Sequence, residues 1–457
     1  MIVVMNKKYF IPGIISSITF ILTFLLFIYT DLTSLTVWTI NVWDNLYETH
    51  NFRTFYEFSA MNLFNLDHTM VGSDILIYIP WAFWNLPLWV AQKFFDYPAA
   101  YHAIPQLWSK LFLIFTAVLC IIPVKRICKT VTDKYGDVNT DSTYRMAFMS
   151  CTSFFTVMSL AYAGQNDVMA IFPFLMAVSY LLEGKKKNFF IWTALSIAFK
   201  PFFVFSFVAV ILLEEKNLLK IMGKIAAGFS IYVLQKIPFI GASMYKESLS
   251  YGPTSGSIKL LMKSVLDIPP AGASLFFLTL GALYLAIYFM DFELAAEKIE
   301  HYIYCVTAPM ILFFVFTRYE AYRPFYLVPL LYILMMIKPA YARINLLLEF
   351  VATGCLMVFY LLDDVLFYNT NYIWAKSEWV DYPSISEYLT SKIPGFGYTM
   401  FTAAFVLCMA LVLVINHPKF KSDNKILTMR EEPWLLTARS VVYAVPLMLS
   451  VFIKIIK

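Results

Sequence analysis

The chain has 457 residues, of which 60% are hydrophobic and 14% are charged, and its formal net charge is +5. Soluble domains are about one quarter charged, so this composition excludes an ordinary soluble protein. The small positive charge is accounted for by basic cytoplasmic loops and does not indicate a nucleic-acid partner.

Apolar runs dominate the sequence, and many approach about 20 residues, the length that crosses a bilayer as a helix. The runs are continuous rather than alternating, which excludes a transmembrane β-barrel. In lipid every backbone polar group needs an internal partner, so continuous spans must be helices. The sequence therefore predicts an all-α polytopic membrane protein.

The first apolar run, residues 9–29, follows Lys7 and Lys8, so we expect a cytoplasmic N-terminus. The run is too long for the hydrophobic region of a signal peptide and has no small-residue cleavage site. We expect it to remain as the first span, which places the next loop outside. Five of the six cysteines lie in apolar runs and none forms a CxxC pair, so we interpret them as packing residues.

Residues 74–95 are long enough to span the membrane but contain Pro80, Asn85 and Pro87. Paired prolines break a helix, and the tryptophans of this segment favour the membrane interface. If the segment did span, the basic residues that follow the run 107–124 would lie outside, contrary to the positive-inside rule. We therefore interpret 74–95 as a juxtamembrane or re-entrant element and 107–124 as the second span.

The remaining runs alternate across the membrane and predict about 13 transmembrane helices in a single domain, 1–457. Two of them, 189–199 and 202–214, are so short that they must form a broken pair buried by neighbouring helices. The expected spans are 9–29, 107–124, 146–163, 168–183, 189–199, 202–214, 221–240, 272–290, 302–317, 325–337, 345–366, 399–415 and 435–453. The expected external loops are 31–106, which carries the juxtamembrane helices, 241–270 and 367–398.

The first external loop carries the candidate catalytic base. Asp44 precedes Glu48 by one helical turn, so the two carboxylates can share a face. A general base must reach an acceptor hydroxyl, and its pKa need only be raised modestly. Asp67, followed by His68, is a second candidate, either as base or as metal ligand. The alternative for Asp44 is a solvated loop acid or helix cap, and the alternative for Asp67 and His68 is an ordinary loop turn. A single histidine with scattered acids is too weak a signal for a firm metal site, so no cofactor is expected, and a divalent metal is possible but not indicated.

Cationic side chains interrupt the apolar pattern at two places. Lys200 lies between two short spans, where a cation costs about 2.5–3.5 kcal/mol. A lipid phosphate would offset that cost, and snorkelling to the interface is the alternative. Arg318 and Arg323 flank Glu320 between two apolar runs, where they would either grip a phosphate or pair with Glu320.

The segment Gln165-Asn166-Asp167 lies at the outer end of the third expected span. In the expected topology it shares the external face with Asp44, Lys200 and the late arginines. The positive-inside rule by itself does not require polar groups of both signs to gather on one face. The presence of these polar groups on one face therefore indicates a functional site on the external side.

These features together resemble the GT-C superfamily of membrane glycosyltransferases, which use polyprenyl-phosphate-linked sugars. The resemblance extends through the span 325–337 and is weak in the C-terminal quarter. The features that carry it are the acid in a long first external loop (Trp43-Asp44-Asn45), the juxtamembrane element after it, Gly164-Gln-Asn-Asp167 before a span, the basic turn Gly184-Lys-Lys-Lys187, the run that ends in Phe199-Lys200-Pro201, and Arg318-Tyr319 before the span near Pro324.

The resemblance implies metal-independent, inverting transfer of a mannose- or glucose-like hexose from a polyprenyl-phosphate donor to a hydroxyl of a cell-surface glycan or glycolipid. Asp44 would take the proton of the acceptor hydroxyl, and the cations would stabilise the leaving phosphate. It also implies a multi-pass plasma-membrane protein with an external active site and the prenyl tail beside the short spans 189–199 and 202–214. The side chains expected to contact substrates are Lys200, Arg318, Arg323, Glu48, His68, Gln165, Asn166, Asp167 and Glu320.

Two other functions are compatible with a helical membrane protein. A lipid-linked saccharide flippase or transporter would need charges along a path through the bilayer, or repeated halves with matching broken helices. A non-enzymatic assembly protein would leave Lys200 and the arginine pair without a role. The expected one-sided distribution of charge favours the transferase.

Overall fold

The computed structural model describes residues 7–62, 71–97, 102–135, 142–251, 261, 264–267, 272–290, 295–317, 323–362, 370–372, 399–419 and 433–456. Of these residues 86% are helical, which confirms the all-α prediction. Within the described parts of the chain, four helices are long and apolar enough to cross a membrane, or up to six if each of two bent pairs is one span. The protein is therefore a helical membrane protein.

The helices of the first half are α1 (Lys7–Leu26), α2 (Thr30–Thr49), η1 (Phe52–Thr54), α3 (Phe55–Met61), η2 (Ile75–Ile77), α4 (Tyr78–Trp84), α5 (Leu86–Phe95), α6 (Ala103–Leu119), α7 (Ile121–Tyr135), α8 (Ser142–Cys151), α9 (Phe154–Thr156), the π-helix η3 (Val157–Ala163), α10 (Val168–Leu182), α11 (Lys186–Phe199), η4 (Pro201–Phe203) and α12 (Val204–Glu214). Those of the second half are α13 (Leu218–Gly228), α14 (Ser230–Leu234), η5 (Ile237–Phe239), α15 (Ser243–Tyr251), α17 (Leu275–Tyr288), α18 (Ala295–Phe316), η6 (Arg323–Tyr326), α19 (Leu327–Ile337), η7 (Pro339–Tyr341), α20 (Ala342–Leu362), α23 (Thr399–Ile415) and α24 (Pro433–Ile456). Two short antiparallel ladders pair β1 (Phe27–Tyr29) with β4 (Thr370–Tyr372) and β2 (Val265–Leu266) with β3 (Ala273–Ser274).

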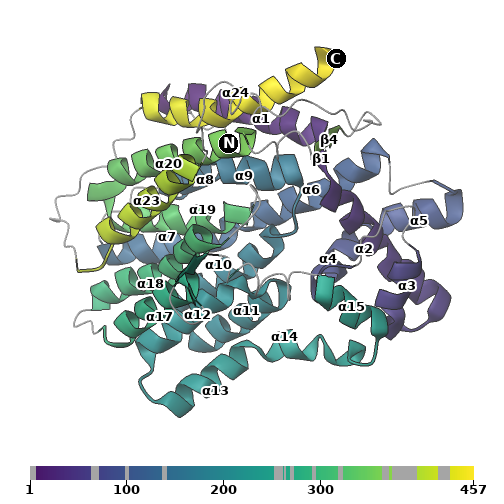
Figure 1. Ribbon diagram of the computed structural model, residues 1–457, viewed down its shortest axis with the longest axis horizontal. Helices are drawn as coiled ribbons and strands as arrows, with labels where there is room; N and C mark the ends of the chain where they lie inside the picture. Colours follow the sequence, from purple (N-terminus) through teal and green to yellow (C-terminus); the bar gives the residue numbers. More distant parts are fainter. Residues whose placement is uncertain are drawn as a thin grey trace.

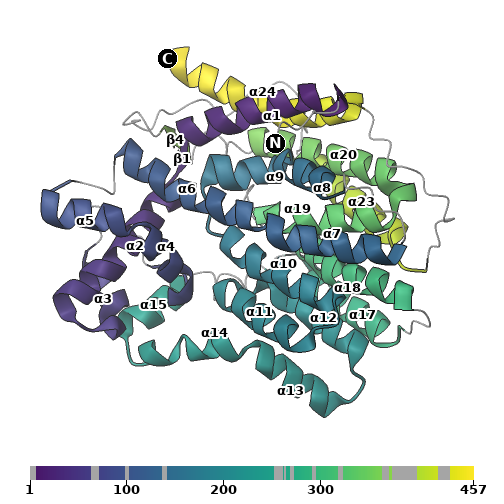
Figure 2. The same cartoon turned by 180° about the vertical axis from the view of Figure 1, so that it is seen from behind.

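The central helices have two chemically different ends. α10 and α11 form an antiparallel hairpin and α7 packs against α10, while α12 packs against α18, which in turn packs against α19 (Figure 1). At one end, which we call the basic end, Lys186 and Lys298 lie 2.9 Å and 3.9 Å from Glu214. At the other end, which we call the Asp167 end, α10 begins after Asp167 and α11 finishes before Lys200. Seen from behind, α1 and α24 run side by side along one edge of this bundle (Figure 2).

The predicted first external loop is largely helical. Its opening stretch is the 20-residue helix α2, most of which is buried, so it is not the solvated loop that its polar sequence indicates. The described parts of residues 30–97, which we call the 30–97 unit, lie with α15 beyond the Asp167 end of the bundle (Figure 1). Residues 74–95 form η2, α4 and α5, with a break at Asn85 where Pro87 occupies the first turn of α5.

A polar latch holds the 30–97 unit against the bundle. The side chain of Gln235 accepts a hydrogen bond from the backbone N–H of Leu76 and donates one of 2.9 Å to the carbonyl of Ala198. Lys236 forms an ion pair of 2.8 Å with Asp74, whose carboxylate also accepts a bond from a tyrosine of α15. The latch therefore fixes η2 beside the end of α11.

Two expected spans are bent in the structure. The segments Arg145–Cys151 and Phe154–Ala163 meet at 57°, and Leu218–Gly228 and Ser230–Phe239 meet at 50°. At the second bend, a Cβ on Gly228 would lie 2.3 Å from a ring carbon of Phe207, so only glycine fits there. The expected spans 146–163 and 221–240 are therefore each interrupted by a bend that the sequence did not indicate.

The six cysteines are free thiols. Cys128, Cys305 and Cys408 are buried, as expected for packing residues, and Cys120 and Cys355 are partly buried. Cys151 is exposed, so the packing interpretation is wrong for that thiol.

Candidate functional site

Asp44 is buried between α2 and α5. Its side chain accepts a hydrogen bond of 2.8 Å from the indole nitrogen of Trp89, and the ammonium of Lys93 lies 3.8 Å away. Trp89 and Lys93 are one helical turn apart on α5, so both face α2. Asp44 is only 7% exposed, which rules out the solvated loop acid that the sequence left open.

The surroundings of Asp44 shift its protonation. Burial raises the pKa of the Asp44 carboxyl above its ordinary value, while the Trp89 hydrogen bond and the charge of Lys93 oppose that rise. A hydrogen bond of 2.7 Å to Glu48 raises the pKa of Lys93, which therefore stays charged. A held carboxylate with a raised pKa is suited to accept a proton from a hydroxyl.

Side chains behind Asp44 fix the angle between α2 and its neighbours. The amide of Asn85 donates hydrogen bonds to the hydroxyls of Thr39, at 2.8 Å, and Ser109, at 3.1 Å. The indole of Trp43 donates to the carbonyl of Ala82 at 2.7 Å. From the sequence, Asn85 was only a polar residue within the segment 74–95, and this supporting role was missed.

A second polar group lies at the Asp167 end. The π-helix η3 stops at Gly164, whose φ of 64° suits glycine, and the following turn carries Asp167 to the start of α10. The hydroxyl of Tyr326 donates a bond of 2.7 Å to one oxygen of Asp167, and Lys200 lies 3.6 Å from the same oxygen. The other oxygen of Asp167 is buried without a hydrogen-bond partner.

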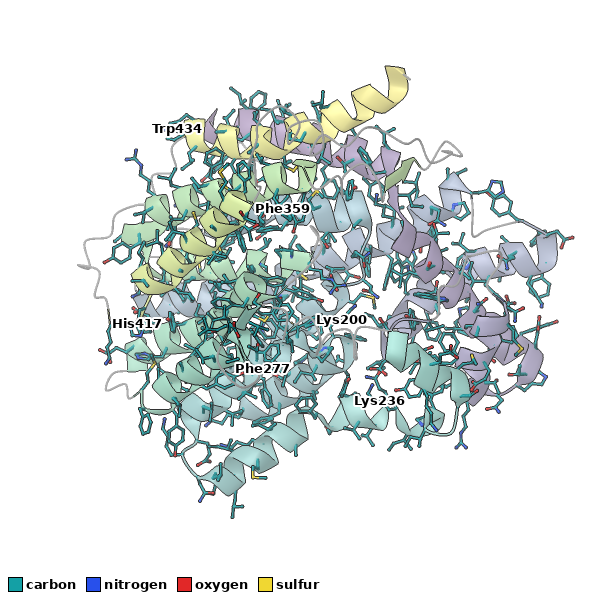
Figure 3. The ribbon with its side chains drawn as sticks, in the orientation of Figure 1. Lys200, Lys236, Phe277, Phe359, His417 and Trp434 are labelled. Atoms are coloured by element: carbon teal, nitrogen blue, oxygen red, sulfur yellow. The ribbon has the colours of Figure 1, made fainter. Side chains whose placement is uncertain are left out.

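Lys200 has a partner that the sequence did not suggest. It ends α11 in an extended conformation because Pro201 follows it, and its side chain is 14% exposed. Figure 3 shows Lys200 and Lys236 towards the 30–97 unit, with His417 at the opposite edge of the molecule. The carboxylate of Asp167 compensates the charge of Lys200, although 3.6 Å exceeds an ordinary hydrogen bond, so the ammonium keeps donors for another anion.

The remaining predicted residues fall into three classes. Gln165 and Asn166 are buried beside Asp167, and Arg323 begins η6, three residues before Tyr326. Glu48 is half exposed and shares Lys93 with Asp44. The residues that lie outside the described parts of the chain are Asp67, His68, Arg318 and Glu320.

The structure brings the predicted residues together in two groups rather than one. Asp44 and Glu48 meet through Lys93, and Asp167 meets Lys200. Leu32 of α2 lies next to Gly164 at the Asp167 end, since a Cβ on Gly164 would lie 3.1 Å from its side chain. Asp44 follows Leu32 on α2 by about 12 residues, which is about 18 Å of helix. None of the contacts among the described residues joins the two groups directly.

Two buried cations within apolar helices were missed. Arg439 of α24 is 2% exposed and lies 2.8 Å from Glu349 of α20. Lys110 of α6 is fully buried and donates to the carbonyls of Phe24 and Phe27, and to Ala161. A cation inside an apolar run is the signal that identifies both, and it shows that charge is not confined to one end of the bundle.

Among the described residues, no three His, Cys, Asp or Glu side chains gather as metal ligands would. Comparison with protein-family models, with curated proteins and with solved structures gives no match to this chain.

Proposed function

We propose that this chain is a membrane glycosyltransferase that moves a hexose from a polyprenyl-phosphate-linked donor to a hydroxyl of a glycan or glycolipid acceptor. The observation that carries the proposal is the placement of Lys200, Asp167 and Tyr326 at the end of the bundle on which the 30–97 unit, with Asp44, is docked. A charged donor headgroup would meet its cation there, at the boundary between an apolar body and a polar unit.

The proposed reaction is an inverting displacement at the anomeric carbon. Asp44 takes the proton of the acceptor hydroxyl, whose oxygen forms a bond to that carbon as the bond to the phosphate oxygen breaks. The departing lipid phosphate gains negative charge, which Lys200 and Arg323 stabilise. Asp67 is the second candidate base, and no metal takes part.

The proposed topology resembles a GT-C arrangement of about 13 crossings, with the shorter apolar helices also spanning. It is supported by the lysines that gather at the basic end, because cationic side chains favour the cytoplasmic side. The N-terminus is then cytoplasmic, and the Asp167 end faces outward from a plasma membrane.

Transfer by the purified chain in detergent tests the base. The assay follows a labelled hexose from a polyprenyl-phosphate donor to a glycolipid acceptor, for the wild type, Asp44→Asn and Asp67→Asn. Loss of a general base lowers the rate by about 10²–10⁴, and we expect that loss for Asp44→Asn. Asp96→Asn is the matched control, because Asp96 is exposed and asparagine tolerates its φ of 51°. Full activity of both Asp44→Asn and Asp67→Asn would remove the base assignments.

The role of Lys200 is tested separately with Lys200→Met. We expect a fall in kcat of about 10² or more, because the leaving phosphate would lose a charge that stabilises it. Lys224→Met is the control, since Lys224 pairs with Glu215 near the basic end at 3.0 Å. Equal activity of the two variants would show that Lys200 serves only its ion pair with Asp167.

A lipid-linked saccharide flippase is the second candidate. The buried pair of Arg439 and Glu349 favours it, because transporters carry charged side chains within the bilayer. If the protein moves lipid-linked sugar across liposome membranes but transfers none to an acceptor, the flippase replaces the transferase.

A further inference from the structure

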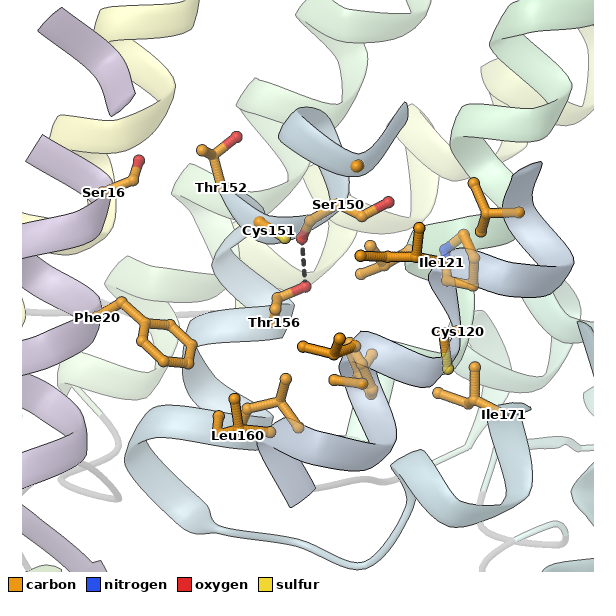
Figure 4. Close-up of a pocket in the computed structure, with 18 of the residues that line it drawn as sticks. Ser16, Phe20, Cys120, Ile121, Ser150, Cys151, Thr152, Thr156, Leu160 and Ile171 are labelled. Atoms are coloured by element: carbon orange, nitrogen blue, oxygen red, sulfur yellow. Dashed lines mark hydrogen bonds between the residues drawn. The ribbon is translucent and has the colours of Figure 1, made fainter. Parts of the chain in front are cut away.

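A cavity of about 380 Å³ lies beneath α1. Figure 4 shows Ser16 and Phe20 of α1 on one side of it, Thr156 in the middle, and Cys120 and Ile121 across from them. The other walls come from α6, α8, η3, α10 and the η6–α19 segment. It does not lie beside α11 and α12, where the prenyl tail was expected.

The wall of the cavity offers few free polar groups. Every described residue that lines it is uncharged. The hydroxyl of Ser16 is bonded to Ser440, that of Thr152 accepts from Arg439, and that of Thr156 donates to a backbone carbonyl. Water is stable in a cavity only with two to four polar partners, so an apolar occupant suits this one better.

The cavity opens sideways onto an apolar surface. Ile21 of α1, Val118 of α6 and Ile121 of α7 line it and are also exposed, at 55%, 54% and 44%. The segments Tyr9–Leu26 and Ala103–Asp133 that carry them are candidate membrane spans. The cavity therefore borders two segments that are long and apolar enough to cross a membrane.

We propose that this cavity binds one acyl chain of a membrane phospholipid. A water molecule occupies about 30 Å³ of liquid and a methylene group is of similar size, so 380 Å³ holds roughly a dozen carbons. A space for about a dozen carbons matches most of one acyl chain but only a small part of a long polyprenol. The inner wall includes Phe325, which is next to Tyr326, the residue that donates to Asp167. A bound acyl chain therefore packs against η6 and supports its position. This binding does not depend on glycosyl transfer.

The native thiol of Cys151 reports on the cavity, because Cys151 lines the cavity and is exposed, whereas Cys355 does not line it. The full chain, delipidated in detergent, is labelled with an alkyl maleimide, and each modified peptide is quantified by mass spectrometry. A phospholipid with twelve-carbon chains, present at about ten times its dissociation constant, slows Cys151 labelling about tenfold and leaves Cys355 unchanged. A polyprenyl phosphate is the second arm of the experiment.

Cavity-filling variants complete the test. Ala147→Leu and Ala117→Leu fill the space from α8 and from α6 and abolish the protection, whereas Ala403→Leu, on an exposed position of α23, preserves it. Two positions are used so that, if one variant misfolds, the other still tests the cavity. Protection by polyprenyl phosphate at lower concentrations than phospholipid would overturn the acyl-chain assignment. Protection by neither lipid, or unchanged protection in the filled variants, would overturn the site.

Discussion

Replacing Glu349 with glutamine tests the buried ion pair of α20 and α24. Arg439 donates to both oxygens of Glu349, at 2.8 Å and 3.2 Å, and to the hydroxyl of Thr152 at 2.7 Å. Both side chains of the pair are 2% exposed. Glu349→Gln keeps the shape of the side chain but removes its charge, so Arg439 is left as an uncompensated buried cation.

The size of the expected loss of stability follows from the burial of both side chains. Removing one partner of a buried pair costs about 3–5 kcal/mol, because the remaining charge keeps its desolvation penalty. Glu183→Gln is the matched control, since Glu183 lies 2.7 Å from Arg126 but is 19% exposed. Solvent partly screens that pair, so we expect a smaller loss of stability than for Glu349→Gln. The assay is unfolding in mixed detergent micelles, followed by the fluorescence of the 10 tryptophans.

A double variant separates charge from shape. Glu349→Met with Arg439→Met removes both charges, and apolar replacement of a buried pair is often neutral. We expect the double variant to be more stable than Glu349→Gln alone. Equal losses of stability in Glu349→Gln and Glu183→Gln, or a double variant that is the least stable of all, would show that the buried charge of Arg439 does not need Glu349.

Three further changes test other parts of the structure. Lys93→Met removes a charge that lowers the pKa of Asp44, so the acid limb of the transfer rate against pH moves to higher pH. Because the folded-state pKa of Asp44 is raised, protonation favours folding, and its contribution to stability grows as pH falls through that value. Gly228→Ala overpacks the second bend and costs about 1–3 kcal/mol, whereas Gly223→Ala, with nothing within 4 Å, adds about 0.5–1 kcal/mol, both by micelle unfolding. Lys236→Met weakens the latch and speeds limited proteolysis within the 30–97 unit.

Each of these changes has an outcome that contradicts its argument. An unmoved acid limb in Lys93→Met would mean that Asp44 does not set the pH dependence of transfer. Equal stability of the two glycine variants would mean that the ring facing Gly228 can move aside. Unchanged cleavage in Lys236→Met would mean that packing, not the ion pair, holds the unit.

Part of the candidate site follows from the sequence. Asp44 and Glu48 stand one helical turn apart, and Lys200 interrupts an apolar stretch, so local spacing alone singles them out. Their partners could not be predicted in the same way. Lys93 is supplied by another helix, and Tyr326 reaches Asp167 from a distant part of the chain.

The sequence by itself determined that this protein is built from membrane helices. In lipid, the backbone of a continuous apolar run can form hydrogen bonds only within its own segment, so each such run must be a helix whatever the rest of the chain does. Only the tertiary structure decided how the buried charges are compensated and that α2 is buried rather than a solvated loop. It placed Asp167 beside Lys200 and Glu349 beside Arg439, in pairs from different helices. A sequence shows that a charge is present, but its partner is fixed by packing between segments far apart in the chain.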